Sequence, residues 1–306
     1  MKLGILTSIL DGWTFQETLE IAQDMGFSCL EVACWPKGEA ERRYAGVSHL
    51  DVDRVLRDGG YREEILAGCR GKGVSISALA FYPNTMDPDP AKREENISHL
   101  RKVIQASSCL HVNLVTTFIG RDQTKNIEEN LKLFGEIWPG IIRFAEEWNV
   151  KIAIENCPML FGRDQWPGGQ NLMTSPALWR RMFQMIPSPS FGLNFDPSHF
   201  VWQQMDYIRP LYEFKDRLFH LHCKDIKVYP ERLSQCGVMA YPLEYMAPKL
   251  PGLGDVDWGR WFSVLYDIGY SGGVCIEVED RAFESGRESI LDSIRLSKRY
   301  LDQFVV

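Results

Sequence analysis

The stretch Lys151-Ile152-Ala153-Ile154-Glu155-Asn156 decides the fold of this chain, because three later stretches repeat its pattern. The repeats are Phe191-Gly-Leu-Asn-Phe-Asp196, Leu218-Phe-His-Leu-His222 and Gly272-Gly-Val-Cys-Ile-Glu277. Each is a short run that ends in a side chain able to bind a metal ion. In chain order, these side chains are Glu155, Asp196, His222 and Glu277.

Each of the four stretches alternates in the way a β-strand does. Ile152 and Ile154 lie on one face of the first stretch and Ala153 and Glu155 on the other, because successive strand side chains point to opposite sides. In all four stretches the bulky apolar face is the one without the acid or the imidazole. This pattern predicts a sheet covered outside by helices, with a tight interior that carries polar groups at one end.

Strand and helix patterns alternate along the whole chain. We expect strands at 2–8, 29–35, 74–81, 111–118, 151–156, 191–196, 218–224 and 272–279. We expect helices at 14–25, 61–72, 91–108, 125–149, 176–186, 206–216, 257–268 and 283–303. Eight alternating units without a linker predict an α/β protein with one (β/α)8 TIM barrel domain over residues 1–306.

Two details refine this expectation. The helix at 125–149 contains Pro139, which predicts a kink or a split there. Long loops follow strands two, five and seven, and all of them leave the face where barrel enzymes build their sites. A doubly wound open sheet is the structural alternative, but Ser8–Gly12 after the first strand does not match the glycine-rich phosphate turn of that fold.

Composition indicates a soluble globular protein. The 306 residues are 45% hydrophobic and 25% charged, and the net charge of −7 argues against a nucleic-acid partner. The eight cysteines include no CxxC pair, which favours reduced thiols and a cytoplasmic location. We expect no signal peptide, and we expect no membrane contact because no apolar run approaches the ~20 residues of a membrane span.

The four strand-end side chains predict a metal site, because the ends of parallel barrel strands meet at one mouth. Three carboxylates and one imidazole form a mostly oxygen ligand set. This set favours Mn²⁺ or Mg²⁺, and Zn²⁺, Co²⁺ and Fe²⁺ also fit. The alternative is that the four side chains form separate salt bridges. This interpretation is weaker, because all four lie at strand ends and on the strand face without bulky apolar residues.

Five motifs carry a family resemblance: Ile154-Glu155-Asn156, Asp196-Pro-Ser-His199, His222-x-Lys-Asp225, Gly252-Leu-Gly-Asp-Val-Asp-Trp258 and Ile276-Glu277. Together they resemble the xylose-isomerase-like barrel superfamily, which includes sugar phosphate isomerases and epimerases. The resemblance implies that Glu155, Asp196, His222 and Glu277 hold one divalent ion, most simply Mn²⁺. It also implies that Glu155 and Glu277 face each other across a carbohydrate as acid and base, and that His199 contacts a substrate hydroxyl.

The expected reaction is isomerisation or epimerisation of a sugar or sugar derivative through a metal-bound enediolate. One departure from the family pattern weakens a simple ketose 3-epimerase: Phe161 stands where such enzymes often carry another glutamate. A lyase, dehydratase or hydrolase acting on a keto-sugar or inosose at the same metal is the alternative. A metal-free sugar-binding protein is a further interpretation. Abasic-site DNA repair, known in a related branch, uses a three-zinc cluster with many histidines, and the six histidines and net negative charge of this chain argue against it.

Other residues are candidates for contact with the substrate. Glu31, Trp35 and Lys224 lie at strand ends, and each has an alternative role in a structural ion pair or in packing. His220 is predicted to be a buried, hydrogen-bonded histidine behind the ligands, and Glu279 is predicted to form a rim salt bridge. No phosphate-binding turn is apparent, and the aromatic residues in the insertions would suit a homo-oligomer.

Overall fold

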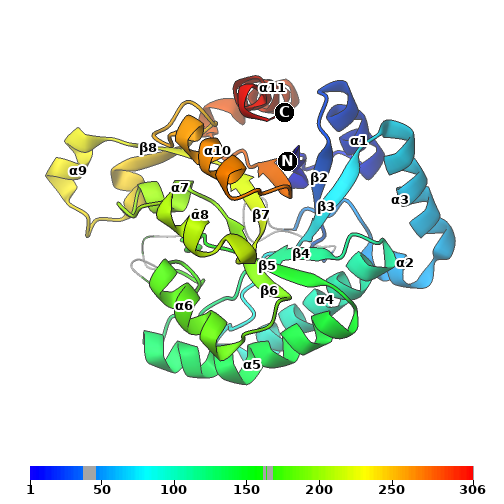
Figure 1. The fold of residues 1–306 in the computed structure, drawn as a ribbon, viewed down its shortest axis with the longest axis horizontal. Helices are drawn as coiled ribbons and strands as arrows, with labels where there is room; N and C mark the ends of the chain where they lie inside the picture. The colour runs from blue at the N-terminus through cyan, green and yellow to red at the C-terminus, as the bar shows by residue number, and fades with distance from the viewer. Residues whose placement is uncertain (37–45, 161–162, 164–167, 306) are drawn as a thin grey trace.

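The computed structural model describes residues 1–36, 46–160, 163 and 168–305. Within these residues, parallel strands close into a barrel in the order β1-β10-β7-β6-β5-β4-β3-β2 (Figure 1). The barrel strands are β1 (Lys2–Leu6), β2 (Cys29–Ala33), β3 (Ser75–Ala80), β4 (Leu114–Thr117), β5 (Lys151–Glu155), β6 (Phe191–Phe195), β7 (Leu218–Cys223) and β10 (Gly273–Ile276). The predicted (β/α)8 fold is confirmed.

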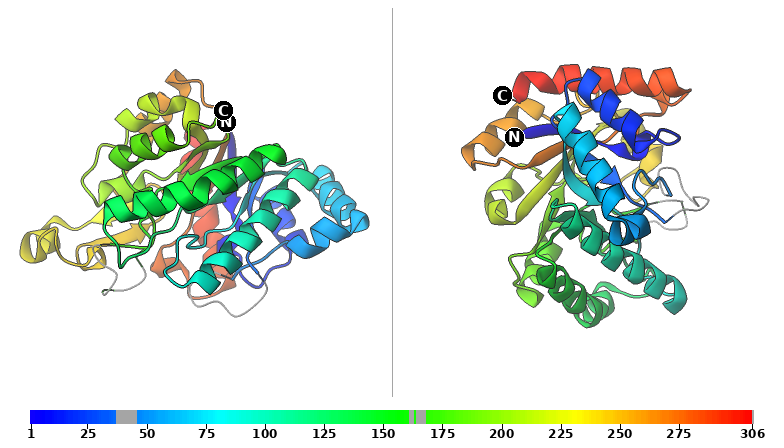
Figure 2. Two further views of the ribbon diagram at one scale, coloured as in Figure 1. Left: turned by 90° about the horizontal axis from the view of Figure 1, so that it is seen from below. Right: turned by 90° about the vertical axis from the view of Figure 1, so that its right-hand side faces the viewer.

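Helices cover the outside of the barrel (Figures 1 and 2). The main ones are α1 (Phe15–Asp24), α3 (Gly59–Lys72), α4 (Pro90–Cys109), α5 (Ile127–Glu147), α6 (Pro176–Met185), α8 (Arg209–Glu213), α10 (Trp258–Asp267) and α11 (Arg287–Leu301). Shorter elements are α2 (Val52–Arg57), α7 (Ser198–Val201) and the 3₁₀ turns at 7–9, 215–217, 242–244, 281–283 and 302–304. The chain ends lie close to each other in both figures.

The two faces of each strand pack differently, as predicted: one faces the outer helices and the other faces the barrel interior. The outward side chain of Phe195 on β6 is fully buried and meets Trp179 of α6 and Trp261 of α10 edge-on, at ring-centroid distances of 5.3 and 5.1 Å. Burial of such an aromatic side chain contributes roughly 2–3 kcal/mol. The opposite faces of the strands bring polar side chains, among them Glu31, Thr116 and His220, into the barrel interior, where all three are buried.

Helix α1 shows how the sequence sets a helix boundary. The Thr14 side chain accepts a hydrogen bond from the backbone N–H of Glu17, and the Glu17 carboxylate accepts one from the Thr14 N–H, which forms the predicted capping box. Gly26 follows the last turn with φ +72°, a conformation that glycine adopts without steric cost. The predicted start and end of this helix are therefore confirmed.

Two local features differ from the expected ones: the helix is not split at Pro139, and the segment after β7 is not a simple loop. Helix α5 is one continuous helix through Pro139, because its buried face, which includes Phe134, Trp138 and Ile142, holds it against the barrel despite the lost backbone hydrogen bond. The segment after β7, expected to be a loop, contains the antiparallel pair β8 (Asp225–Val228) and β9 (Met246–Lys249) with helix α9 (Pro230–Cys236) between them.

This arm projects from the barrel and is drawn in yellow in Figures 1 and 2. A small apolar cluster anchors its base, in which Ile226 and Met246 pack with Trp202 and Tyr245. Because β8 begins two residues after the end of β7, the arm stands beside the carboxyl ends of the barrel strands. Among the described helices, none combines the length and apolar character needed to cross a bilayer.

Candidate metal centre

The four predicted ligands come together at the carboxyl end of the barrel. Each offers one ligand atom, and these atoms all lie within 4.8 Å of one another. Glu155 ends β5, Asp196 follows β6, His222 lies near the end of β7, and Glu277 follows β10. Asp196 and His222 are fully buried, and Glu155 is 3% exposed. Strand geometry therefore supplies the cluster, because each ligand occupies an inward position at the same end of a parallel strand.

The facing atoms of this cluster lack hydrogen-bond partners. These atoms are Glu155 Oε1, Asp196 Oδ2, His222 Nδ1 and Glu277 Oε2. His222 Nδ1 lies 3.2 Å from Glu277 Oε2 and 3.5 Å from Glu155 Oε1. Leaving a buried polar atom without a hydrogen bond costs about 1–3 kcal/mol. Ion pairs with the Lys224 ammonium offset part of this cost at Glu277 Oε2 and Asp196 Oδ2, and the four converging atoms have the chemistry of a cation-binding set. A divalent cation between them would satisfy all four at once.

Glu31 orients the imidazole of His222. Its Oε2 accepts a hydrogen bond from His222 Nε2 at 2.7 Å, which leaves the Nδ1 lone pair to face the carboxylates. Its Oε1 accepts hydrogen bonds from Tyr82 at 2.5 Å and Thr116 at 2.6 Å. Burial raises the pKa of Glu31, but the neighbouring His222 and His220 charges and its hydrogen bonds outweigh burial and lower that pKa to about 2.

Glu31 was a candidate for either substrate contact or a structural ion pair, and it lies behind His222, one of the four predicted metal ligands. Its side chain is fully buried, and its partners are His222, Tyr82 and Thr116 rather than Lys224. The arrangement favours the structural alternative for this residue. His220 is also buried, and its ring nitrogens contact Asn194 Oδ1 and Ser77 Oγ at 3.1 Å each, which confirms its predicted place behind the ligands.

Lys224 introduces one buried cation into the cluster. Its Nζ lies 3.1 Å from Glu277 Oε2, 3.2 Å from Glu279 Oε2 and 3.5 Å from Asp196 Oδ2. Burial lowers the pKa of this lysine, but the three carboxylates outweigh it and raise the pKa well above the usual value. The contact with Glu279 confirms the predicted salt bridge. Because carboxylates still outnumber Lys224, the site retains negative charge that a divalent ion would neutralise.

His199 completes the mouth of the barrel. Its Nε2 lies 3.2 Å from Asp196 Oδ2 and 3.6 Å from Glu155 Oε1. Helix α7 begins directly before it, and Asp196 Oδ1 accepts the N–H of Ser198 at 2.8 Å. Of the predicted substrate contacts, His199 and Lys224 therefore border the ligand cluster.

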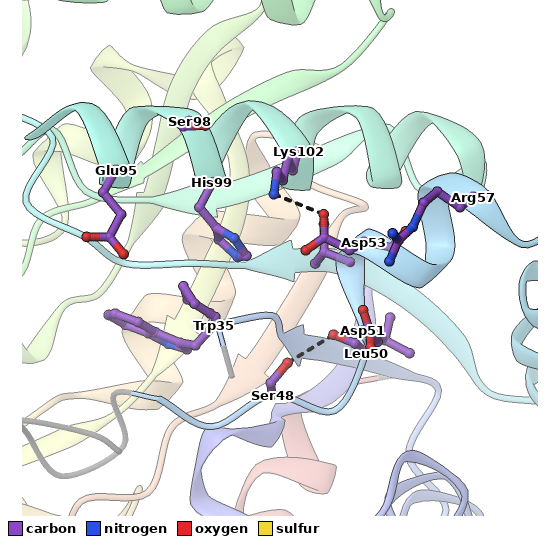
Figure 3. A pocket seen from close by; sticks show the side chains of 12 residues that line it. Trp35, Ser48, Leu50, Asp51, Asp53, Arg57, Glu95, Ser98, His99 and Lys102 are labelled. Carbon is purple, nitrogen blue, oxygen red and sulfur yellow. Dashed lines mark hydrogen bonds and ion pairs between the residues drawn. The ribbon is translucent and has the colours of Figure 1, made fainter. Parts of the chain in front are cut away.

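Trp35 comes two residues after the end of β2. Its ring packs edge-on against Phe81 at a centroid distance of 4.9 Å. It lines a cavity of about 440 Å³ with α2 and α4 residues that include His99 and Lys102 (Figure 3). The four metal-ligand candidates do not line this cavity. Phe161, the departure from the family pattern, falls outside the described residues.

Several residues that hold the site had no role assigned from the sequence. Asn156 joins the ends of β5 and β6: its Nδ2 donates to Asp196 O at 2.9 Å, and its Oδ1 accepts from Asp196 N at 2.8 Å. Tyr82 and Thr116 anchor Glu31. Asn156 directly follows the candidate ligand Glu155 in the sequence, and this position could have predicted a supporting role at the site. The partners of Tyr82 lie 51 and 140 residues away, so no local pattern points to them.

A closed parallel barrel with a carboxylate and imidazole cluster at its mouth defines the class of (β/α)8 proteins with a candidate metal centre. The sequence model of the xylose isomerase-like TIM barrel family matches residues 19–300, and the chain belongs to that family.

Curated relatives cover much of the chain. It is 26% identical to "Uncharacterized protein YfiH" of Bacillus subtilis, over 99% of this chain and all of that one. It is 24% identical to the "Putative L-ribulose-5-phosphate 3-epimerase SgbU" of Haemophilus influenzae, over 99% and 96%. An "Inosose dehydratase" of Lactiplantibacillus plantarum is 24% identical over 62% of each chain.

Among solved structures, the IolI protein described with a bound zinc atom superposes with a TM-score of 0.72. Its sequence is 18% identical, and the alignment covers 100% of this chain and 98% of that one. This likeness shows the shared barrel.

Proposed function

We propose that this protein is a divalent-metal-dependent isomerase or epimerase of a sugar or sugar derivative. The observation that carries the proposal is the convergence of four buried ligand atoms without hydrogen-bond partners, from Glu155, Asp196, His222 and Glu277. The family, which includes epimerases and inosose dehydratases among the relatives, supports a carbohydrate substrate. Mn²⁺ suits a set of three carboxylates and one imidazole.

The proposed reaction moves a proton from and back to carbon, with Glu155 and Glu277 as its acid and base. When bound, the metal ion would polarise a substrate carbonyl and so raise the acidity of the adjacent carbon. One glutamate, Glu155 or Glu277, takes the proton from that carbon, which leaves an enediolate. The other returns a proton to complete isomerisation or epimerisation, and no atoms are lost.

The remaining charged groups hold the substrate. Lys224 would donate an N–H bond to a substrate oxygen in exchange for one of its three carboxylate contacts, of which the one to Asp196, at 3.5 Å, is the longest. His199, at 7% exposure, is placed to contact a hydroxyl. Burial of the cluster excludes water, which strengthens these interactions and prevents loss of the reactive intermediate.

Elimination of water is the second candidate. The same enediolate can expel a hydroxide from the neighbouring carbon, and the Lys224 ammonium beside Glu277 would stabilise the departing charge. Similarity to an inosose dehydratase favours this reaction over hydrolysis. The first proton transfer is common to both candidates.

The test is a screen of keto-sugars, aldoses and inososes with Mn²⁺ in deuterium oxide. We expect deuterium at one carbon of the recovered sugar, and we expect Glu155→Gln and Glu277→Gln to lower the exchange rate by a factor of at least about 100. Deuterium in recovered substrate without net elimination identifies the isomerase or epimerase. Loss of water identifies the dehydratase. Full turnover by either variant would refute the acid and base assignment.

A further inference from the structure

A thiol lies beside the four-ligand cluster. Cys157 follows Glu155 by two residues in the loop after β5, and its side chain is partly buried. One ligand atom from each of Glu155, Cys157 and His199 lies within 4.8 Å of the other two. The carboxylate of Glu155 therefore belongs to two clusters, of which only the first was predicted from the strand pattern.

His199 provides independent support for a ligand at this second cluster. Its Nε2 is buried and has no hydrogen-bond partner. The nearest carboxylate atom is Asp196 Oδ2 at 3.2 Å, and that atom is one of the four that face the first centre. An ion in the first centre would engage Asp196, and His199 Nε2 would then face Glu155 and Cys157.

The loop holds the thiol in a defined position. Cys157 Sγ accepts the backbone N–H of Met159 at 3.4 Å. The buried Asn171 donates from Nδ2 to the backbone oxygens of Glu155 at 2.9 Å and Cys157 at 2.8 Å. These bonds tie the thiol to the same strand end that carries the carboxylate, so binding an ion would require little rearrangement.

We propose that Glu155, Cys157 and His199 form a second metal site, adjacent to the first, for a divalent ion that accepts thiolate, such as Zn²⁺ or Co²⁺. Tetrahedral ligand atoms lie roughly 3.5 Å apart, a spacing compatible with this cluster after small side-chain movements. Sulfur and imidazole favour Zn²⁺ and Co²⁺ over Mn²⁺ and Mg²⁺. Three protein ligands leave a fourth position open to water or substrate.

Binding is balanced by loss of one proton, since the thiol must ionise to coordinate and its proton passes to solvent. Glu155 would bridge the two ions, as carboxylates do in two-metal sites with ions about 3.5–4 Å apart. The proposal goes beyond the sugar chemistry above, and with both sites filled His199 would coordinate the second ion instead of contacting a substrate hydroxyl.

The test is a titration of the metal-free protein with Co²⁺, followed by absorbance and by metal analysis after desalting. We expect the wild-type protein to bind two equivalents of Co²⁺ per chain and to show a near-ultraviolet charge-transfer band from thiolate to cobalt. Cys157→Ser and Cys157→Ala should retain one equivalent and lose the band. Cys236→Ser is the matched control, because Cys236 is also partly buried but lies on α9, and it should behave as the wild type.

Other outcomes separate the two proposals. One equivalent without a band in the wild type overturns the second site and leaves the first intact. A band that persists in Cys157→Ser places the thiolate ligand elsewhere and also overturns it. A single equivalent whose band disappears in Cys157→Ser contradicts both sites, because the ion then takes the thiol in place of the four-ligand set. His222→Asn should lose one equivalent yet retain the band, and loss of the band there would overturn independent thiolate coordination.

Discussion

The contact between Glu31 and His222 sets the chemistry of the candidate centre at the scale of single residues. A carboxylate 2.7 Å from Nε2 fixes which imidazole nitrogen carries the proton and directs the other nitrogen towards Glu155 and Glu277. Such partners orient a metal ligand and increase its basicity. Glu31 is itself held by Tyr82 and Thr116, so the imidazole has little freedom to rotate.

Replacement of Glu31 by glutamine should weaken metal binding by about 10- to 100-fold, because the amide orients His222 less strongly and removes the charge behind it. Competition with a chelator for Mn²⁺ measures this affinity. Glu279→Gln is the matched control, since it removes a carboxylate near Lys224 without touching the contact between Glu31 and His222. An equal loss in both variants would show that Glu31 acts through charge alone.

Asp225 organises the arm at the scale of secondary-structure elements. Its Oδ1 accepts the N–H groups of Ile226 at 2.8 Å and Val256 at 3.0 Å, and its Oδ2 accepts Gly252 N at 2.9 Å and Trp258 Nε1 at 2.8 Å. One fully buried carboxylate thus joins the start of β8 to the start of α10. Gly254 packs against this carboxylate so closely that a β-carbon there would overlap it.

We expect Asp225→Asn to lower the free energy of unfolding by about 2–6 kcal/mol. Asparagine keeps one oxygen, so two of the four donors would face an NH₂ group, and each buried unpaired donor costs about 1–3 kcal/mol. Urea denaturation measures the change. Asp255→Asn is the control: its side chain is 27% exposed, and we expect a smaller loss. Equal stability of Asp225→Asn and the wild type would contradict the bridging role.

At the scale of the whole molecule, the ligand cluster links metal binding to folding. Glu155, Asp196, His222 and Glu277 come from strands separated by long stretches of chain, and only the closed barrel brings them within 4.8 Å. An ion bound there stabilises the native state and not the unfolded chain. Removing it leaves the carboxylates with only partial compensation by Lys224.

Saturation with Mn²⁺ at about 100 times its dissociation constant should raise the melting temperature by about 4 °C for a chain of this length. Without metal, burial lowers the pKa of His222, but Glu31 and Glu155 outweigh it and raise that pKa well above its ordinary value. A proton therefore competes with the ion below the raised pKa, and the shift in melting temperature should grow as the pH rises towards that pKa. Calorimetry measures both effects, and the same shift in His222→Asn would place the ion elsewhere.

The sequence by itself determined the barrel and the placement of its four strand-end ligand candidates. Alternation within Lys151–Glu155 and its repeats is a local property, and parallel strands necessarily bring their ends to one mouth. The tertiary structure alone decided that Glu31 lies behind His222, that Trp35 lines a cavity with residues of α2 and α4, that α5 continues through Pro139, and that Cys157 lies beside His199. These outcomes depend on contacts between residues far apart in the chain, whose distances are fixed only when the barrel closes and its helices pack.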